Sequence, residues 1–273
     1  MEMQKFFNVL TFEFKATFRM TLKKLLFLFG IINVFSIIFF EKANNLSYSA
    51  SVGDCLLYIM KGNEVYIPKL EKPFEIPIMW YLIYLLVFYI IMDYTNTTFY
   101  ILGKQSFIKI KSRYYWWYAK CIMCLCVTIL SYITIICSIF CVAIFRGNVS
   151  FMISLEIAEV ISNISFVEYS TISIWNSILF IPILTVFTIG IIQILISLLG
   201  KTLYSYFLIC IYLVASTYYH KYYIFIGNFM IPIRNRLMYT RGYDSILALT
   251  IDIGLLLGAF YGGKIIIRKY DVM

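Results

Sequence analysis

The stretch SRYYWWYAKCIMCLCVTILSYITIICSIFCVAIFR, Ser112–Arg146, decides the fold. It begins with a basic, aromatic block that ends at Lys120, and a long apolar run follows without a single charge until Arg146. An apolar run of this length can cross the hydrocarbon core of a bilayer as an α-helix. Aromatic residues beside cations are typical of the membrane–water interface. The stretch therefore predicts a membrane-spanning helix that starts in an interfacial segment.

The overall composition also places this chain in a membrane. Of its 273 residues, 62% are hydrophobic and 14% are charged, whereas a soluble domain carries about 25% charged residues. A soluble core cannot bury so much apolar surface at this length, so we predict an integral membrane protein. The N-terminus has neither the apolar core nor the small-residue cleavage site of a signal peptide, so we expect the first span to direct insertion.

Continuous apolar runs predict an all-α, polytopic fold with six transmembrane helices in a single membrane domain, residues 1–273. The predicted spans cover about 22–40, 78–102, 119–145, 175–199, 203–219 and 246–265. The fifth is short and rich in Tyr. Because three residues, Gly200 to Thr202, separate it from the fourth, these two spans should form a tight hairpin.

The distribution of Lys and Arg predicts which side of the membrane each segment occupies. If both termini are cytoplasmic, the cytoplasmic segments hold 14 of the 23 Lys and Arg residues but three of the 14 Asp and Glu residues. Cations in short loops favour the cytoplasmic side, so we predict a multi-pass protein of the cell membrane with both termini in the cytoplasm. These cations lie scattered at span ends and form no groove, which argues against nucleic acid as a partner.

Residues 1–21 carry an amphipathic pattern. On a helix, the apolar side would hold Phe6, Phe7, Leu10, Phe14 and Phe18. The polar side would hold Lys5, Asn8, Thr11, Lys15 and Arg19. An aromatic face opposite a cationic face is typical of a helix that lies in the membrane interface. The alternative is that these residues extend the first span inward, but Glu13 and the cations favour the interfacial helix.

Two acids, Asp93 and Asp252, lie inside apolar spans, where a carboxylate is costly and typically faces a cavity or a partner. Each predicts either a polar cavity wall or a latch between helices. A structural acid that is protonated or bonded to Tyr is the alternative. Glycines follow Asp252 at four-residue spacing, a pattern that permits close helix packing: Gly254, Gly258 and Gly262, with Gly263 adjacent.

The sequence carries no signature of an enzyme or of a metal site. Five of the seven Cys lie in the third predicted span without a neighbouring His or acid, so packing explains them better than a metal. The single histidine, His220, has no second His beside it. Phosphate-binding loops, paired-His motifs and Ser nucleophile elbows are absent from the sequence. We therefore predict no catalytic residue, no metal and no cofactor bound by this chain.

The segment 103–120 joins the second and third spans on the cytoplasmic side. We expect Trp116 and Trp117 to lie in the aromatic belt of the membrane. We expect the cations of this segment to face water: Lys104, Lys109, Lys111, Arg113 and Lys120. Two interpretations remain open from these residues, an anchor in the membrane interface and a docking element for a soluble partner.

Two longer segments, 41–77 and 146–174, are predicted on the outer side. Three prolines in the stretch YIPKLEKPFEIP predict irregular backbone in the first. Apolar spacing from Phe151 to Ile161 predicts a short outer helix in the second. The acids Glu156, Glu159 and Glu168 are interpreted as a solvated rim, and attraction of a cationic substrate such as a basic peptide is the alternative.

Taken together, these features resemble permeases of the type-2 class of ATP-binding-cassette transporters, in particular small permeases of bacterial peptide-export or bacteriocin self-protection systems. The resemblance rests on the amphipathic N-terminus, six spans, the stretch DYTNTT, the block SRYYWWYAK and the tail IIIRKYDVM. The positions that match the class are Asp93, Thr97 or Thr98, Arg113, Trp116, Trp117, Lys120, Arg268, Lys269 and Asp271. The stretch IGNFMIPIRNRLMYTRGYDS resembles the re-entrant outer segment of that class, with Pro232 and Arg241 at an outer gate.

The resemblance implies a permease that forms the translocation path for a peptide or another amphiphile. It implies three partners: a cytoplasmic ABC ATPase subunit that binds ATP and Mg²⁺, a second copy of this permease or a homologous permease, and the lipid bilayer. It implies docking of the ATPase on Glu13, Lys109, Arg113, Trp116, Trp117 and Lys120. It also implies a translocation path or helix latch at Asp93, Thr97 and Asp252.

A membrane sensor or immunity scaffold that binds a peptide without transporting it is the main alternative. A membrane-embedded enzyme would need a base and a nucleophile at one depth, whereas Asp93 and Asp252 are expected at different depths. A lone channel would need a selectivity filter, and no filter motif supports one.

Overall fold

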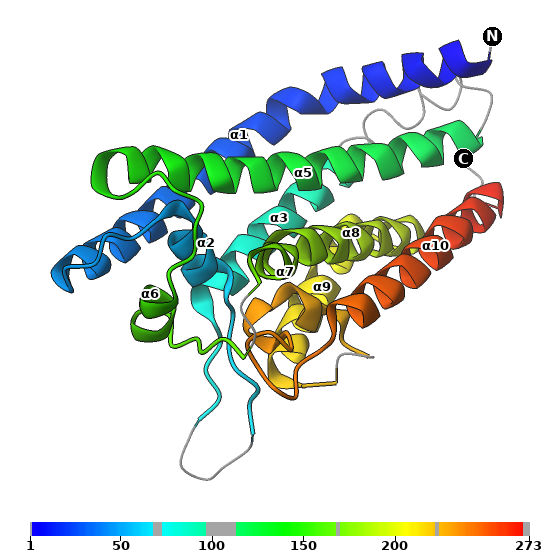
Figure 1. Ribbon diagram of the computed structural model, residues 1–273. Helices are drawn as coiled ribbons and strands as arrows, with labels where there is room; N and C mark the ends of the chain where they lie inside the picture. Colours follow the sequence, from blue (N-terminus) through cyan, green and yellow to red (C-terminus); the bar gives the residue numbers. More distant parts are fainter. Residues whose placement is uncertain (1, 68–72, 97–112, 168–169, 222–223, 270–273) are drawn as a thin grey trace.

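The computed structural model describes residues 2–67, 73–96, 113–167, 170–221 and 224–269. Within these ranges the chain consists of helices joined by loops, with two isolated bridges and no β-strand. Figure 1 shows long helices packed side by side, with short helices and loops gathered beyond one end. The predicted all-α fold is therefore confirmed.

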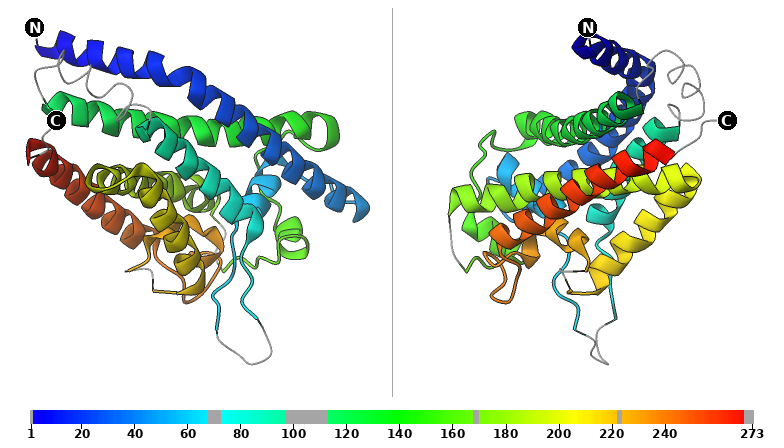
Figure 2. Two further views of the ribbon diagram at one scale, coloured as in Figure 1. Left: turned by 180° about the vertical axis from the view of Figure 1, so that it is seen from behind. Right: turned by 90° about the vertical axis from the view of Figure 1, so that its right-hand side faces the viewer.

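The two ends of the bundle differ in what they hold. The start of α1 (Glu2–Asn45) and the end of α10 (Ser245–Lys269) lie together at one end, which we call the terminal end (Figures 1 and 2). The opposite end, which we call the loop end, holds several short helices: α2 (Val52–Met60), α6 (Leu155–Val160), η3 (Ile226–Met230) and η4 (Pro232–Arg234).

Helix α1 is unbroken over 44 residues. The predicted interfacial helix and the predicted first span are therefore one helix, without a break near residue 21. The sequence from 2 to 45 contains no Pro and a single Gly, so nothing interrupts its backbone hydrogen bonds. A helix needs about 20 residues to cross a membrane. Helix α1 is therefore longer than one crossing requires, by about its first half.

Helix α5 (Arg113–Arg146) lies alongside α1 and runs in the same direction (Figure 1). Midway along the pair, Ser138 Oγ donates a hydrogen bond to the Phe29 carbonyl at 3.0 Å. Near the loop end, Arg146 Nη1 lies 2.5 Å from Glu41 Oε1. A third contact, at the terminal end, is described below. The sequence separation of the partners is nearly constant along the pair, as parallel helices in fixed register require.

Five helices in the described part of the chain are long and apolar enough to cross a membrane: Met20–Asn45, Ile78–Thr95, Tyr114–Arg146, Thr171–Leu199 and Ser245–Arg268. The predicted fifth span corresponds to α9 (Thr202–Tyr218), which is apolar but has 17 residues. Helix α3 (Ile78–Asn96) covers residues 78–96 of the predicted second span, and residues 97–102 lie outside the described residues. Five helices of membrane-spanning length are thus present in the described part of the chain, and the sixth crossing stays a prediction.

The fourth predicted span is a composite helix. It consists of α7 (Thr171–Trp175), the π-helical turn η2 (Asn176–Phe180) and α8 (Ile181–Leu199), which follow one another without a loop. Pro182 near the start of α8 lacks an N–H donor, which favours the wider turn before it. Because α8 ends at Leu199 and α9 begins at Thr202, the predicted tight hairpin is confirmed.

Both outer segments contain a helix. The predicted short helix in 146–174 is present as α6. In 41–77 the sequence predicted irregular backbone and missed α2, whose residues are almost all buried. Ser51 and Asp54 form a capping box at the start of α2, and Asp54 Oδ1 also accepts a hydrogen bond from the Ser154 backbone N–H at 2.7 Å. One carboxylate therefore joins the two outer segments.

Candidate functional site

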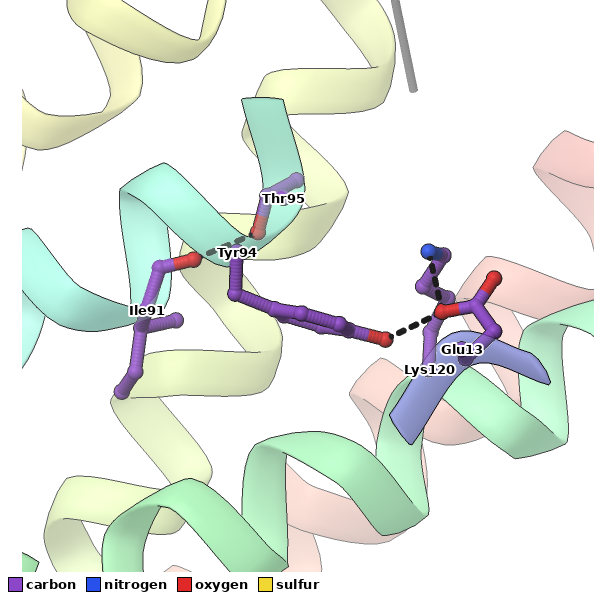
Figure 3. A network of polar contacts seen from close by, with 5 residues as sticks. All are labelled: Glu13, Ile91, Tyr94, Thr95 and Lys120. Carbon is purple, nitrogen blue, oxygen red and sulfur yellow. Dashed lines mark hydrogen bonds and ion pairs between the residues drawn. The ribbon is translucent and has the colours of Figure 1, made fainter. Parts of the chain in front are cut away.

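Three long helices meet through charged and polar side chains at the terminal end. Glu13 of α1 accepts hydrogen bonds on one carboxylate oxygen from two donors, Lys120 of α5 and Tyr94 of α3. Lys120 Nζ lies 2.7 Å from Glu13 Oε2, and the Tyr94 hydroxyl lies 2.8 Å from it. Figure 3 shows the three side chains converging on this oxygen. We call this group the α1–α3–α5 clamp.

The clamp is buried. Lys120 is fully buried and Glu13 is 2% exposed. Lys120 Nζ also lies 4.8 Å from the centroid of the Tyr94 ring and 5.0 Å from that of Trp116, distances at which an aromatic face attracts a cation. Because removal of either charge leaves the other uncompensated inside the protein, Glu13 and Lys120 hold the three helices in one arrangement.

The clamp corrects one prediction about the block SRYYWWYAK. Helix α5 begins at Arg113, so the block forms the first turns of the helix. Lys120 was expected to face water, but it lies one helical turn after Trp116 on the buried side of α5, where it meets Glu13. The side chain of Arg113, and the whole of Lys109, lie outside the described residues.

Trp117 connects the clamp region to the last helix. It is fully buried, and its Nε1–H donates a hydrogen bond to the Phe260 carbonyl of α10 at 3.1 Å. A side chain at Gly263 would overlap the Trp117 ring, so this glycine allows the close approach of α5 and α10. Within the described chain the close packing is therefore made by Gly263, which lies next to the predicted stripe and does not belong to its four-residue spacing. Nothing described lies within 4 Å of a Cβ placed at Gly254, Gly258 or Gly262.

Asp93 forms a second contact between α1 and α3. Its Oδ2 lies 2.6 Å from Lys24 Nζ, which in turn lies 4.0 Å from the centroid of the Tyr89 ring. The Asp93 side chain is 27% exposed and the Lys24 side chain is 22% exposed, so this ion pair is more accessible than the clamp. Asp93 has the geometry of a helix latch, and Thr97 and Thr98, the neighbours predicted with it, lie outside the described residues.

Asp252 lies elsewhere, between α8 and α10. It is fully buried, and its Oδ2 lies 2.6 Å from the hydroxyl oxygen of Thr185 on α8. It therefore also has the geometry of a latch between helices. Asp93 and Asp252 therefore contact different helix pairs.

At the loop end, a single arginine organises the irregular backbone. Arg234 of η4 is fully buried and donates hydrogen bonds to backbone carbonyls at the end of α9, Ser216 at 2.8 Å and Thr217 at 2.6 Å. It also donates to the Asn63 and Glu64 carbonyls, each at 3.1 Å, and to the side-chain oxygens of Asn63 and Asn228. Burial lowers the pKa of Arg234 to about 10, so the guanidinium remains charged at neutral pH.

Sequence reasoning did not single out Arg234. It named Pro232, which is buried at the start of η4, and Arg241, which is exposed in a turn. The available signal was an arginine directly after the apolar run FMIPI, where a charge requires several acceptors. Tyr94, Lys24 and Thr185 were also missed, because the partner of a buried acid depends on which helices are neighbours.

An apolar groove runs between α8 and α9. It encloses about 460 Å³ and is lined by side chains from both helices, the following loop and α10: Ile189, Ile192, Ile196, Leu208, Ile209, Tyr212, Ile224, Ile226 and Leu255. Its lining suits an acyl chain or an apolar side chain of a bound molecule.

The charged side chains of the clamp and of the Asp93 contact link helices of this chain to one another. Within the described ranges, no group of three or more His, Cys, Asp and Glu residues could hold a metal ion. The acids and cations of the clamp and latches contact neighbouring helices of the same chain. Comparisons of the chain with protein-family models, with curated proteins and with solved structures find no match.

Proposed function

We propose that this chain is the membrane-spanning permease subunit of an ATP-driven ABC exporter, and that a separate cytoplasmic ATPase subunit hydrolyses the ATP. The observation that carries the proposal is the α1–α3–α5 clamp. The resemblance assigns ATPase docking to the N-terminal helix and to the connection before α5. In the structure, Glu13 and Lys120 join these same elements.

The contacts supply a path along which movement at the terminal end reaches the rest of the bundle. A partner that displaces the start of α1 or α5 acts on both helices through Glu13 and Lys120. Trp117 transmits the displacement to α10 through its contact with Gly263. Asp252 and Thr185 then link α10 to α8, which borders the apolar groove. Packed helices with two discrete arrangements respond to such a displacement as a unit.

The proposal assigns the predicted docking residues two different roles. Lys109 and Arg113 are the candidates for direct contact with the ATPase. Glu13, Trp116 and Lys120, all buried, hold the docking elements together from inside. Trp117, also buried, passes the movement onward.

The proposed topology places the terminal end in the cytoplasm of a cell with the chain in its cell membrane. Helix α9 completes a sixth crossing, and η3 and η4 form a re-entrant outer segment held by Arg234, with Pro232 and Arg241 at the outer gate. The first half of α1 lies in the interface, and its exposed side chains Phe7, Phe14 and Phe18 support this placement. A second permease copy or a homologous permease completes the translocation path.

The proposed cargo is a peptide or another amphiphile that enters from the membrane. The apolar groove between α8 and α9 supports this class because its lining matches an apolar chain rather than an ion or a sugar.

Purification of the full chain from its native membrane in mild detergent tests the proposal. We expect an ATPase subunit in stoichiometric amount and ATP hydrolysis that increases when the two are reconstituted in lipid. A chain that repeatedly purifies without a nucleotide-binding partner contradicts the proposal. A partner whose hydrolysis-deficient variant still gives full protection against the peptide favours the sensor or immunity scaffold instead.

A further inference from the structure

Asp252 differs from the other acids found inside the membrane domain. Glu13 and Asp93 each lie within 2.7 Å of a lysine Nζ. Asp252 is fully buried, but no cation in the described part of the chain pairs with it, and its Oδ1 has no hydrogen-bond partner there. An ionised carboxylate in such surroundings would bear a full, uncompensated charge in apolar protein, which is far more costly than burial of a neutral carboxyl.

The hydrogen bonds around Thr185 show where a proton fits. Thr185 has one hydroxyl hydrogen, but its Oγ1 lies 2.9 Å from the Ile181 carbonyl and 2.6 Å from Asp252 Oδ2. Both neighbours are acceptors if Asp252 is ionised, and one hydrogen cannot satisfy both fully. If Asp252 carries a proton on Oδ2, it donates to Thr185, which donates to Ile181, and both short contacts are explained.

Two phenols interact electrostatically with Asp252, those of Tyr212 on α9 and of Tyr243 just before α10. The Tyr243 hydroxyl donates to the Phe229 carbonyl at 3.2 Å, and the Tyr212 hydroxyl lies 3.5 Å from the Ile224 carbonyl. Neither phenol therefore supplies the charge or the donor that an ionised Asp252 would need.

We propose that Asp252 is a proton-binding site inside the membrane domain. Its carboxyl holds a proton while α8 and α10 are packed as described. It releases that proton to water, as a carboxylate and a hydrated proton, when α10 separates from α8. Asp252 lies seven residues from Ser245 and 17 from Lys269, or about 10 Å and about 25 Å along the helix. Exchange therefore takes place from the loop end. The inference does not depend on an ATPase partner.

Infrared spectroscopy of the full chain in lipid nanodiscs at neutral pH tests the inference. We expect a carbonyl band of a protonated carboxylic acid, of one-group intensity, in the wild type and its loss in Asp252→Asn. Thr185→Val removes the acceptor of the acid proton, so the band should persist at a shifted frequency. Thr188→Val is the matched control, since this buried threonine of α8 donates to the Leu184 carbonyl and should leave the band in place.

A wild-type spectrum without an acid band that depends on Asp252 overturns the inference. A band that depends on Asp252 but is identical in the wild type and in Thr185→Val overturns the placement of the proton on Oδ2, because the acid would then not donate a hydrogen bond to Thr185. Preserved helical circular dichroism in each variant shows that a lost band reports the acid and not unfolding.

Discussion

The two ends of the bundle hold buried charge in different ways. At the terminal end, the buried acid Glu13 and the buried base Lys120 neutralise each other between separate long helices. At the loop end, the Arg234 guanidinium is surrounded by neutral oxygens, and the Asp54 carboxylate by N–H and hydroxyl groups of Ser51 and Ser154.

The difference suggests different tasks for the two ends. A pair of opposite charges fixes the distance between two helices. When the helices separate, however, each charge can be solvated by water or can pair with another charge. A charge held by many backbone groups fixes the conformation of irregular segments, which have few regular hydrogen bonds of their own. We therefore expect the terminal end to rearrange during function and the loop end to stay rigid.

The largest effect should follow from loss of the arginine at the loop end. Arg234→Met leaves the carbonyls of Asn63, Glu64, Ser216 and Thr217 without their donor, so we expect a loss of about 4 kcal/mol in the free energy of unfolding. Arg236→Met, at an exposed position two residues away, is the control and should change little. Denaturant titration in detergent measures both. Equal stability of the two variants would remove the basis for calling the loop end rigid.

The next largest effect should appear at the clamp. Lys120→Met leaves Glu13 buried without a counter-charge, and we expect a loss of about 3 kcal/mol. Adding Glu13→Gln to this variant removes the unpaired charge and should restore part of the stability. Lys15→Met, at an exposed position of α1, serves as the control in the same titration. If the loss of stability in the double variant equals the sum of the losses in Lys120→Met and in Glu13→Gln, the two charges do not interact.

A packing test separates the clamp region from the rest of α10. Gly263→Ala places a methyl group in the volume of the Trp117 ring, so we expect a loss of about 2 kcal/mol. Gly258→Ala meets no described atom within 4 Å, and the higher helix propensity of Ala should leave stability unchanged or slightly higher. Thermal unfolding in detergent compares the two; similar midpoints would contradict the contact between α5 and α10.

A smaller effect is expected at the more exposed pair of the same end. Asp93→Asn removes the ion pair with Lys24, whose side chain is 22% exposed, and partly exposed pairs contribute about 1 kcal/mol or less. The Lys24→Met and Asp93→Asn variants should each lose less stability than Lys120→Met. A loss as large as that at the clamp would mean that exposure does not distinguish the two pairs.

The smallest effect concerns pH at the loop end. Burial raises the pKa of Asp54 above its usual 3.8, although Ser51 and Ser154 donate hydrogen bonds to it. The folded state therefore keeps this proton to higher pH than the unfolded state. Stability should fall as pH rises from 3.8 through the folded pKa and then level off. Asp54→Asn should lack this pH-dependent fall in stability. Identical stability–pH profiles of the wild type and the variant would show that Asp54 does not cause it.

The sequence predicted the parts of the fold that depend on one helix at a time. Apolar runs identified the long helices, and Gly200 with Lys201 identified the hairpin between α8 and α9. The structure has no break near residue 21, because an amphipathic pattern marks the face of a helix and not its end. Helix α2 was missed because it is short, and because the hydrogen bond from Ser154 to Asp54 forms only when segments 41–77 and 146–174 come together.

The candidate site was predicted in part. Glu13, Lys120, Asp93 and Asp252 were named, because charges in an apolar chain are conspicuous. Their partners were not named, since Glu13 and Lys120 are 107 residues apart in sequence and meet only when α1 and α5 pack in parallel. For the same reason Lys120 was expected in water: its helical phase is readable from the sequence, but the identity of the neighbouring helix is not.

Exchange of the two charges tests the clamp most directly. Glu13→Lys and Lys120→Glu each place two like charges side by side in a buried site, so each alone should lower the unfolding midpoint and the yield of copurified ATPase. The variant with both exchanges restores opposite charges, and we predict recovery of most of the midpoint and of the bound ATPase. A doubly exchanged chain no more stable than the worse single variant would contradict the clamp as the link between α1 and α5.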